Sequence, residues 1–368
     1  MKMINLFIFF FLCTASLFAQ DITGLPAITK DDRILILAPH PDDETIGAGG
    51  VIQKALKANA AIKVVWLTNG DNNELAFIVY KKRIVFSKNE LLHLGEVRRQ
   101  EAIAAMKVLG LRDDQMAFLG YPDFGTLEVF KRYWGDTKPF KSMLTRVRNV
   151  PYQDSPSYNA LYVGESILND LRKILKDFQP TKIFTTLPSD INADHRAAHL
   201  FLQVALWDLE NKIPPPECYS FLVHSAKWPV PRGFHPKEPL LPPKVFSNSQ
   251  IEWKILDLTP EEIKKKNQAI AVFKTQIEYS PSYLFSFNRK NELFGKYKTV
   301  NLQQAYKGTI DWEDIKNQWP IEGNVIDEKN DDQHIDSVVY AIKDNFLYVR
   351  IKLKNWRSEL MGLNLYNR

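Results

Sequence analysis

The sequence predicts an α/β protein built on a mostly parallel sheet with helices on both faces, followed by a small β-rich segment at the C-terminus. Short apolar runs alternate with stretches of helical periodicity over most of the chain, which is the pattern of repeated β–α–β units. Polar clusters follow two of these apolar runs, at the strand ends where open parallel sheets hold their ligand sites. Together these features favour a Rossmann-like core.

The first apolar run, 33–38, predicts a buried strand because it is short, continuous and followed by glycines suited to a turn into a helix. The stretch 96–110 has apolar residues at helical spacing and ends in Gly110, which suits a helix C-cap. The same reasoning along the chain predicts strands near 33–38, 62–68, 115–119, 181–187 and 217–223, and helices near 47–59, 96–109, 164–178 and 194–210.

Two irregular stretches interrupt this alternation. Residues 125–162 are rich in aromatic, basic and turn residues without a sustained period, and we expect them to form an ordered wall of a binding cleft. Prolines crowd the stretch 229–243. Thr259, Pro260 and Glu262 then supply an N-cap, a proline at the first helical position and a capping box, so a last long helix is expected to begin there.

The chain changes character after about residue 300. The runs 337–342 and 346–353 are separated by three polar residues, a pattern typical of a β-hairpin. We therefore predict a main domain over 20–300 and a small β-rich segment over 301–368 that does not contribute to the functional site.

Residues 1–19 have the pattern of a secretory signal peptide. Lys2 precedes an apolar run, and small residues lead up to a cleavage position after Ala19, so we expect export to the periplasm or the extracellular space. A retained anchor is the alternative, but the apolar run is short for a spanning helix, and no stable membrane insertion is expected after cleavage. Cleavage would leave Cys218 as the single cysteine, which excludes an internal disulfide.

Chain length and net charge limit the size of the fold and the kinds of partner that can be expected. With 368 residues the chain can bury a large core and form one large domain plus something smaller. The formal net charge is only +5, and acidic and basic residues are interspersed. Nucleic acid is therefore not an expected partner.

The pentapeptide 40–44, His-Pro-Asp-Asp-Glu, follows the first predicted strand and is the most informative stretch of the chain. Zn²⁺ accepts imidazole nitrogen and carboxylate oxygen, and a spare carboxylate beside the open coordination position can take a proton from bound water. A capped turn is the structural alternative. The glycines that follow hint at a phosphate loop, but the neighbouring carboxylates would repel a pyrophosphate.

A second polar cluster, 188–199, lies at a topologically equivalent point. It contains Asp194, His195 and His199, follows the strand predicted at 181–187 and opens a helical pattern. Two strand ends thus carry His and carboxylate groups, which favours a metal site over a capped turn.

These motifs make the chain resemble the PIG-L/LmbE family of zinc-dependent N-acetyl-sugar deacetylases over roughly residues 31–280. The first motif is specific, and the others are weak individually but occur in the family's order. The resemblance rests on 38–44, 67–71, the helix 98–110, 118–123 and 194–196.

Carried onto this sequence, the resemblance implies that His40, Asp43 and His195 bind Zn²⁺ and that Asp42 is the general base. Asp194 would orient an imidazole ligand, and its structural alternative is a helix N-cap.

The resemblance also implies residues that could contact the substrate. Arg98 is similar to the family's substrate-contacting arginine; the alternative is a solvated ion pair with Glu101 three residues on. Asp123 and Asn69 follow predicted strands on the active side and could bind sugar hydroxyls.

Asn192 departs from the family pattern, in which many relatives place a histidine three residues before the last zinc ligand. An amide can donate a hydrogen bond to substrate, but it cannot protonate a departing amine. The proton must then come from Asp42 or from another histidine. His224, just past the strand predicted at 217–223, is the first candidate, with an expected pKa near its reference value of about 6.5.

We expect, on this resemblance, an exported zinc-dependent hydrolase that removes an N-acetyl or other N-acyl group from an amino sugar or glycoconjugate. One alternative is an amidase that acts on a non-sugar N-acyl substrate. The other is a non-catalytic glycan-binding protein that has the same fold.

Overall fold

A computed structural model of the protein describes residues 22–72, 87–246, 251–278 and 280–297, and shorter pieces at 305–306, 309–310, 312, 335–343 and 346–353. The predicted signal segment 1–19 lies outside the described residues, so export stays a prediction. Within the described ranges, no helix combines the length and the apolar character that crossing a bilayer requires.

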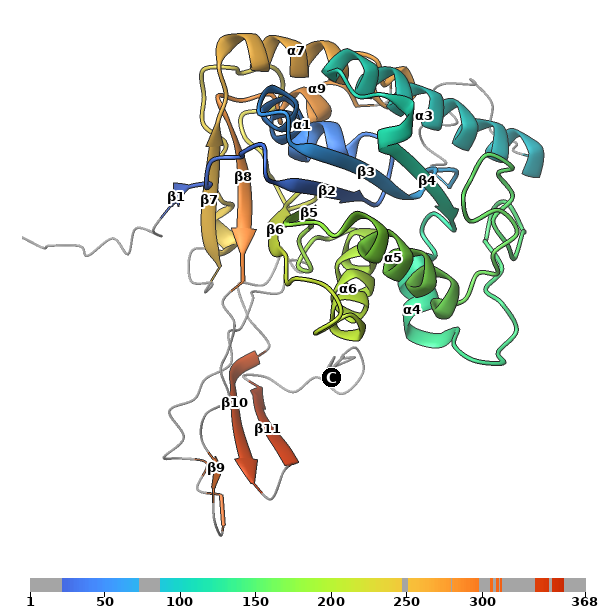
Figure 1. The fold of residues 1–368 in the computed structure, drawn as a ribbon, viewed down its shortest axis with the longest axis vertical. Helices are drawn as coiled ribbons and strands as arrows, with labels where there is room; N and C mark the ends of the chain where they lie inside the picture. Colours follow the sequence, from blue (N-terminus) through green and yellow to red (C-terminus); the bar gives the residue numbers. More distant parts are fainter. Residues whose placement is uncertain are drawn as a thin grey trace, which may run out of the picture.

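An eight-stranded sheet forms the centre of the main domain (Figure 1). Neighbouring strands of this sheet pair in parallel, except that β8 runs antiparallel to both β6 and β7. The predicted mostly parallel sheet is therefore confirmed. In spatial order the strands are β1 (Thr23–Gly24), β7 (Glu252–Asp257), β8 (Asn291–Lys296), β6 (Glu217–Phe221), β5 (Lys182–Thr186), β2 (Arg33–Ala38), β3 (Ala61–Thr68) and β4 (Met116–Tyr121).

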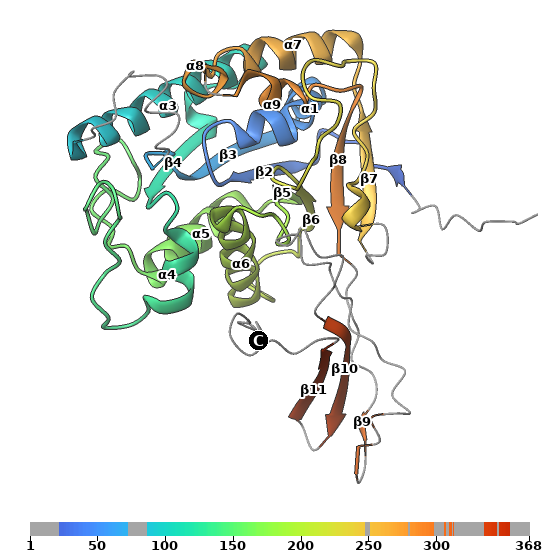
Figure 2. The same ribbon diagram turned by 180° about the vertical axis from the view of Figure 1, so that it is seen from behind.

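Helices cover both faces of this sheet (Figures 1 and 2). One face carries α1 (Asp43–Lys57), α3 (Lys88–Leu109), α7 (Pro260–Ile270), α8 (Lys274–Ile277) and α9 (Pro281–Phe285). The other face carries α4 (Thr126–Arg132), α5 (Gly164–Phe178) and α6 (Ala193–Asp208). Short 3₁₀ turns, η1 (Asp113–Gln115) and η2 (Lys244–Phe246), complete the elements of this domain.

Strand β2 shows why both faces need cover. Side chains alternate along a strand, so Ile34 and Ile36 enter one hydrophobic core while Leu35 and Leu37 enter the other. A strand buried on both faces needs a continuous apolar sequence, which is the feature that predicted it.

Most predicted elements lie within a few residues of their expected bounds. Helix α3 differs at its start: it begins at Lys88, not near residue 96, because Ser87 and Glu90 form a capping box upstream. The predicted capping box of α7 is present between Thr259 and Glu262. The helix is shorter than the long helix that was expected there, since it ends at Ile270.

The aromatic stretch 125–162 contributes α4 and then a series of turns. Two of its aromatic side chains pack inward, since Phe130 and Trp134 contact Phe201 of α6 with ring centroids 4.9 and 6.0 Å apart. These aromatics form part of the core between the sheet and α6.

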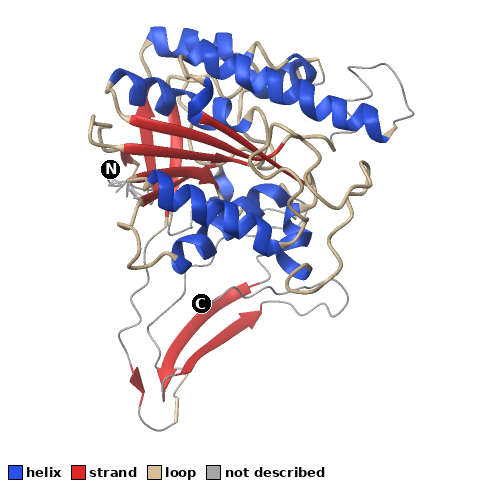
Figure 3. Cartoon of the chain, turned by 45° about the vertical axis from the view of Figure 1, so that its right-hand side comes forward, coloured by secondary structure: helices blue, strands red, loops and turns tan. Residues whose placement is uncertain are grey.

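The predicted C-terminal hairpin is confirmed in its strands. Strand β10 (Ile335–Lys343) pairs antiparallel with β11 (Phe346–Leu353), and the short β9 (Ala305–Tyr306) pairs parallel with β10 (Figure 3). Val339 and Ala341 are buried in a small cluster separate from the main cores. The predicted division near residue 300 stays a prediction.

Candidate metal site

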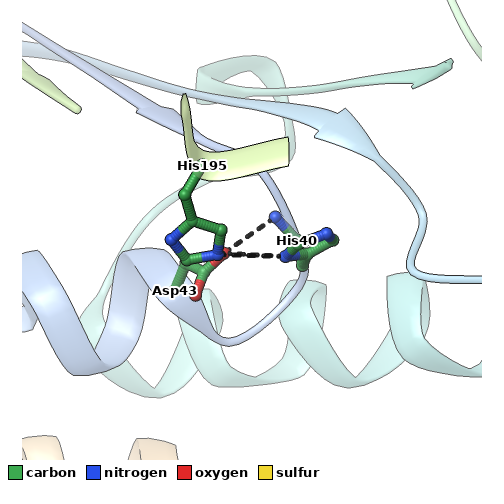
Figure 4. A group of neighbouring side chains, drawn as sticks. All are labelled: His40, Asp43 and His195. Atoms are coloured by element: carbon green, nitrogen blue, oxygen red, sulfur yellow. Dashed lines mark hydrogen bonds and ion pairs between the residues drawn. The ribbon is translucent and has the colours of Figure 1, made fainter. Parts of the chain in front are cut away.

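The order of the strands brings the two polar clusters together. Strands β2 and β5 are parallel neighbours, with Ile36 opposite Phe184, so their carboxyl ends lie at the same edge of the sheet. His40 follows β2, Asp43 is the first residue of α1, and His195 lies in the first turn of α6, which follows β5. Figure 4 shows the three side chains pointing toward one another.

Three donor atoms of these residues form a nearly equilateral triangle. Asp43 Oδ2 lies 3.2 Å from His40 Nδ1 and 3.1 Å from His195 Nε2, and the two nitrogens are 3.3 Å apart. In a tetrahedral zinc site with ligands about 2.0–2.1 Å from the ion, the ligand atoms lie about 3.3–3.4 Å apart. The triangle therefore has the size and the donor types of three ligands around one Zn²⁺.

The second nitrogen of each imidazole faces carboxylates. His40 Nε2 lies 3.1 Å from Asp123 Oδ1 and 3.2 Å from Asp194 Oδ2, and His195 Nδ1 lies 3.2 Å from Asp190 Oδ2. Carboxylates at this position fix the tautomer and orientation of metal-binding histidines. Each imidazole is thus held with one nitrogen directed into the triangle.

Negative charge exceeds positive charge in this buried cluster. Burial alone would lower the pKa of His40, but Asp123 and the other carboxylates beside it hold that pKa well above its usual value. Burial opposes the same effect at His195, where Asp190 and Asp43 raise the pKa to about 9. Without a bound cation, protons on the two imidazoles therefore compensate the charge of the carboxylates. A metal ion that binds to such ligands would displace these protons.

A cavity of about 390 Å³ opens beside the triangle. It is polar at the triangle, and Tyr283 and Leu284 of α9 give it an apolar side. The described residues that line it are His40, Asp42, Asp43, Ile46, Arg98, Asp123, Phe124, Asn192, Val223, His224, Gln276, Ser280, Tyr283 and Leu284. None belongs to 125–162, so the prediction that this stretch forms a cleft wall is wrong for this cavity.

Asp42 lines the cavity next to Asp43 of the donor triangle. Burial raises the pKa of Asp42 to about 8, although the Arg98 guanidinium, 3.5 Å away, acts in the opposite direction. A carboxylate with a raised pKa is a stronger base than an ordinary aspartate. Asp42 thus lies where it could exchange a proton with a group bound in the cavity, and its role as general base stays a prediction.

Arg98 also lines the cavity, but its hydrogen bonds go to the surrounding loops. Its guanidinium donates to Gly70 O at 2.9 Å and to Pro41 O at 3.0 Å. The alternative pairing with Glu101 does not occur in the structure, because Glu101 accepts hydrogen bonds from Thr275.

The other two predicted substrate contacts differ from each other. Asp123 reaches the cavity and accepts a hydrogen bond from Asn72 N, while its second oxygen faces His40. Asn69 does not line the cavity: its side chain is buried at the end of β3, and neither of its polar atoms has a partner among the described residues. Asn69 thus lies at the carboxyl end of β3, as expected, but it does not line this cavity, and its contact with substrate stays a prediction.

Asp194 and Asn192 divide roles that the sequence left open. Asn192 is the N-cap of α6 and accepts a hydrogen bond from Asp194 N, so the N-cap alternative for Asp194 is wrong. Asp194 instead accepts from Phe124 N and from both Thr126 N and Thr126 Oγ1. It thereby joins the start of α4 to the imidazole of His40.

His224 reaches the cavity, but its environment differs from the expected one. Burial lowers its pKa to about 4, with the neighbouring Asp190 opposing this shift. Tyr283 Oη donates to Val223 O at 2.7 Å, so His224 Nδ1, 3.1 Å from the same oxygen, must be the donor to it. The ring is therefore neutral near neutral pH, with Nε2 as its acceptor.

Three further residues were not identified from the sequence. Asp190 faces His195 and also accepts hydrogen bonds from the backbone of Val223 and His224. Tyr283 holds His224, and Glu44 contacts the backbone of Asp42. Asp190 is a carboxylate in the second polar cluster, so the sequence could have indicated that it belongs to the site. No sequence pattern indicated Tyr283.

The fold and the triangle define the class of protein: an α/β domain whose residues at the carboxyl ends of β2 and β5 could hold one metal ion. A family comparison agrees with this class. Residues 35–206 match the family model of PIG-L, described as GlcNAc-PI de-N-acetylase. The predicted resemblance to this family is therefore confirmed over residues 35–206.

Two curated relatives are named 1D-myo-inositol 2-acetamido-2-deoxy-alpha-D-glucopyranoside deacetylase. The one from Mycobacterium sp. (strain KMS) is 27% identical over 183 residues, which cover 48% of this chain and 52% of the relative. The one from Nocardioides sp. (strain ATCC BAA-499 / JS614) is 35% identical over 107 residues, which cover 29% of this chain and 33% of the relative. The chain thus spans about half the length, or less, of these relatives.

Among solved structures, N,N'-diacetylchitobiose deacetylase from Pyrococcus horikoshii has 20% sequence identity to the chain and a TM-score of 0.44. The match covers 74% of this chain and 86% of that protein.

Proposed function

We propose that this protein is a zinc-dependent deacetylase that removes an N-acetyl or other N-acyl group from an amino sugar or glycoconjugate. The observation that carries the proposal is the triangle of His40 Nδ1, Asp43 Oδ2 and His195 Nε2, whose edges of 3.1–3.3 Å suit one Zn²⁺. The PIG-L match and the names of the curated relatives support the substrate class.

A bound Zn²⁺ would supply Lewis acidity, which polarises an amide carbonyl and lowers the pKa of a water molecule. The chain's own residues supply the remaining functions. Asp42, on the cavity wall beside Asp43, is the proposed acceptor of the proton from water. Asp123, Asp190 and Asp194 keep the two imidazoles in their orientations.

The departing amine requires a proton, and Asn192 cannot provide it. Neutral His224 presents Nε2 as an acceptor, so it would first have to receive a proton before it could give one. Asp42, once it has collected the proton from water, is therefore the proposed donor to the amine. His224 Nε2 and the side chains of Asn192 and Arg98 are proposed to position the substrate, since all three residues line the cavity.

A substrate panel tests this function. The purified protein would be incubated with chitooligosaccharides, other N-acetylated sugars and simple N-acyl amides, and released acetate and free amine would be measured together with the zinc content. Equal amounts of acetate and amine from the sugars support the proposal. Turnover of the simple amides alone would indicate a non-sugar amidase, and glycan binding without turnover would indicate a binding protein.

We also propose export, on the pattern of residues 1–19. N-terminal sequencing of protein recovered outside the cytoplasm should give Gln20 as the first residue.

A further inference from the structure

Asp42, the proposed base, has an unusual backbone conformation. Its φ of 121° and ψ of −34° lie in a region that residues with a side chain rarely adopt. A residue stays in such a conformation only when the surrounding structure holds it there, and such residues concentrate at functional sites. The groups that hold Asp42 are therefore of interest.

The peptide group between Pro41 and Asp42 is bonded on both sides. Its N–H donates to Glu44 Oε2 at 3.0 Å, and its carbonyl accepts from the guanidinium of Arg98 at 3.0 Å. With only one of these two hydrogen bonds, the peptide group could still rotate about that bond. With both in place the peptide plane is fixed, and with it the direction in which the Asp42 side chain leaves the backbone.

Glu44 is itself rigidly held. The indole N–H of Trp66 donates to Glu44 Oε2 at 2.8 Å, and Thr45 Oγ1 donates to Glu44 Oε1 at 2.7 Å. Trp66 is fully buried in β3 and stacks on Phe118 with ring centroids 4.1 Å apart. Glu44 therefore transmits the position of the central sheet to the peptide of Asp42.

Glu44 has no other evident task at the site. It is completely buried, it does not line the cavity, and it is not part of the donor triangle. A buried carboxylate is costly, so its presence requires an interaction that uses it. Its one contact with the proposed machinery is the backbone of Asp42.

We propose that Glu44, held by Trp66, is a positioning residue that fixes Asp42 in the conformation in which it acts as base. This inference rests on the proposed function, because it assumes that Asp42 is the base.

A double-mutant cycle between Glu44 and Asp42 tests the inference. In Glu44→Gln the amide oxygen could still accept from Asp42 N and Trp66 Nε1, so the test uses Glu44→Met, which fills a similar volume but has no acceptor oxygen. It should lower kcat by about tenfold or more, since small misplacements of a catalytic group have effects of this size, and leave KM and zinc content unchanged. In the Asp42→Asn background the same change should alter kcat by less than about twofold, because the group through which Glu44 acts is already gone.

The outcomes separate the two hypotheses. An equal loss of kcat in both backgrounds, or a loss of zinc with Glu44→Met, would show that Glu44 supports the site in general and would overturn the inference. If Asp42→Asn alone keeps its rate while zinc-loaded, the assignment of Asp42 as base fails, whatever Glu44 does.

Trp66→Phe gives an independent variant in case Glu44→Met does not fold. It keeps a buried ring but removes the donor to Glu44, and should lower kcat with KM unchanged. Trp253→Phe is the matched control, because Trp253 is equally buried in β7 and its indole N–H has no partner among the described residues. Equal effects of the two changes on kcat would count against the inference.

The strain at Asp42 can be measured without any activity assay. Asp42→Gly and Asp42→Ala both remove the carboxylate, but only Gly adopts a φ of 121° freely. The Gly variant should therefore have the higher melting temperature. A higher melting temperature for the Ala variant would mean that the backbone at this position is not held as proposed.

Discussion

At the scale of single residues, the site depends on carboxylates that do not belong to the donor triangle. Asp190 is the clearest example, since it faces His195 Nδ1 and accepts two backbone N–H groups from the end of β6. It is fully buried and does not line the cavity. Its effect on the reaction must therefore pass through His195 and the loop that carries His224.

Asp190→Asn should lower zinc affinity by about 10–100-fold, the usual effect of removing a carboxylate behind a metal-binding histidine. Competition with a chelator of known affinity would measure it. The matched control is Asp170→Asn, because Asp170 is also an acceptor of several hydrogen bonds, from Tyr121 and Ser157, but lies outside the site. Unchanged affinity in the Asp190 variant would show that the ring of His195 is oriented by other contacts.

At the scale of elements, helix α1, whose first residue is Asp43, is interrupted at Ala48. Ala48 has a non-helical φ of −141°. On either side of Ala48, two side chains bond to backbone groups of the helix. Lys266 of α7 donates to Ile46 O, and Glu292 of β8 accepts from Gly50 N and Val51 N. Gly50 has no room for a Cβ, which would lie 2.9 Å from the carboxylate of Glu292. Close packing thus accounts for this glycine without a phosphate loop.

Lys266→Met should destabilise the protein by about 3–5 kcal/mol, because it leaves the Glu292 carboxylate buried without its cation. The two groups are 2.6 Å apart and fully buried. Denaturant unfolding would measure the change in the free energy of unfolding. Lys264→Met is the control, since Lys264 is exposed on the same helix and its replacement should have little effect; equal effects would mean that the buried pair contributes nothing special.

Asp32 links the starts of β2 and β5, the two strands that bring the site together. It accepts hydrogen bonds from Thr29 N and Thr181 Oγ1 and pairs with Lys182. Burial opposes ionisation of Asp32, but Lys182 and these hydrogen bonds lower its pKa below the usual 3.8.

Because the folded-state pKa of Asp32 is the lower one, its stabilisation is present above pH 3.8 and is lost as the pH falls through the folded-state pKa. Asp32→Asn should therefore be less stable than the wild type at pH 7, and the difference should shrink toward pH 3. Chemical unfolding at several pH values would measure this. Asp114→Asn, in an exposed pair with Arg112, should show no measurable difference at any pH; a constant deficit in the Asp32 variant would contradict the linkage.

At the scale of the whole molecule, the main domain extends through β8. This strand lies between β7 and β6 in the sheet, and α9, just before it, supplies Tyr283 to the cavity. The hairpin of β10 and β11 has its own small cluster, and none of its described residues lines the cavity.

Truncation after Tyr297 should therefore leave zinc content and kcat close to those of the full chain. Truncation after residue 279 would remove Tyr283 and β8 and should prevent folding. Zinc analysis and circular dichroism of both variants would test this. Loss of zinc in the longer variant would show that the C-terminal segment and the main domain form one folding unit.

The sequence by itself determined the elements and the local half of the site. Continuous apolar runs and capping residues act over a few positions, so β2 and α5 were predicted at their observed bounds and the capping box of α7 at its observed residues. His40 and Asp43 are three residues apart at one turn, so their pairing was also visible in the sequence.

Tertiary structure decided which distant residues meet. His195 joins His40 across 155 positions because β2 and β5 are neighbours, and Lys266 and Glu292 meet in the gap in α1. The positive φ of Asp42, the lowered pKa of His224 and the position of Asn69 outside the cavity likewise follow from burial and neighbours. Strand order, register and desolvation arise only when the sheet is assembled, so no local pattern in the chain contains them.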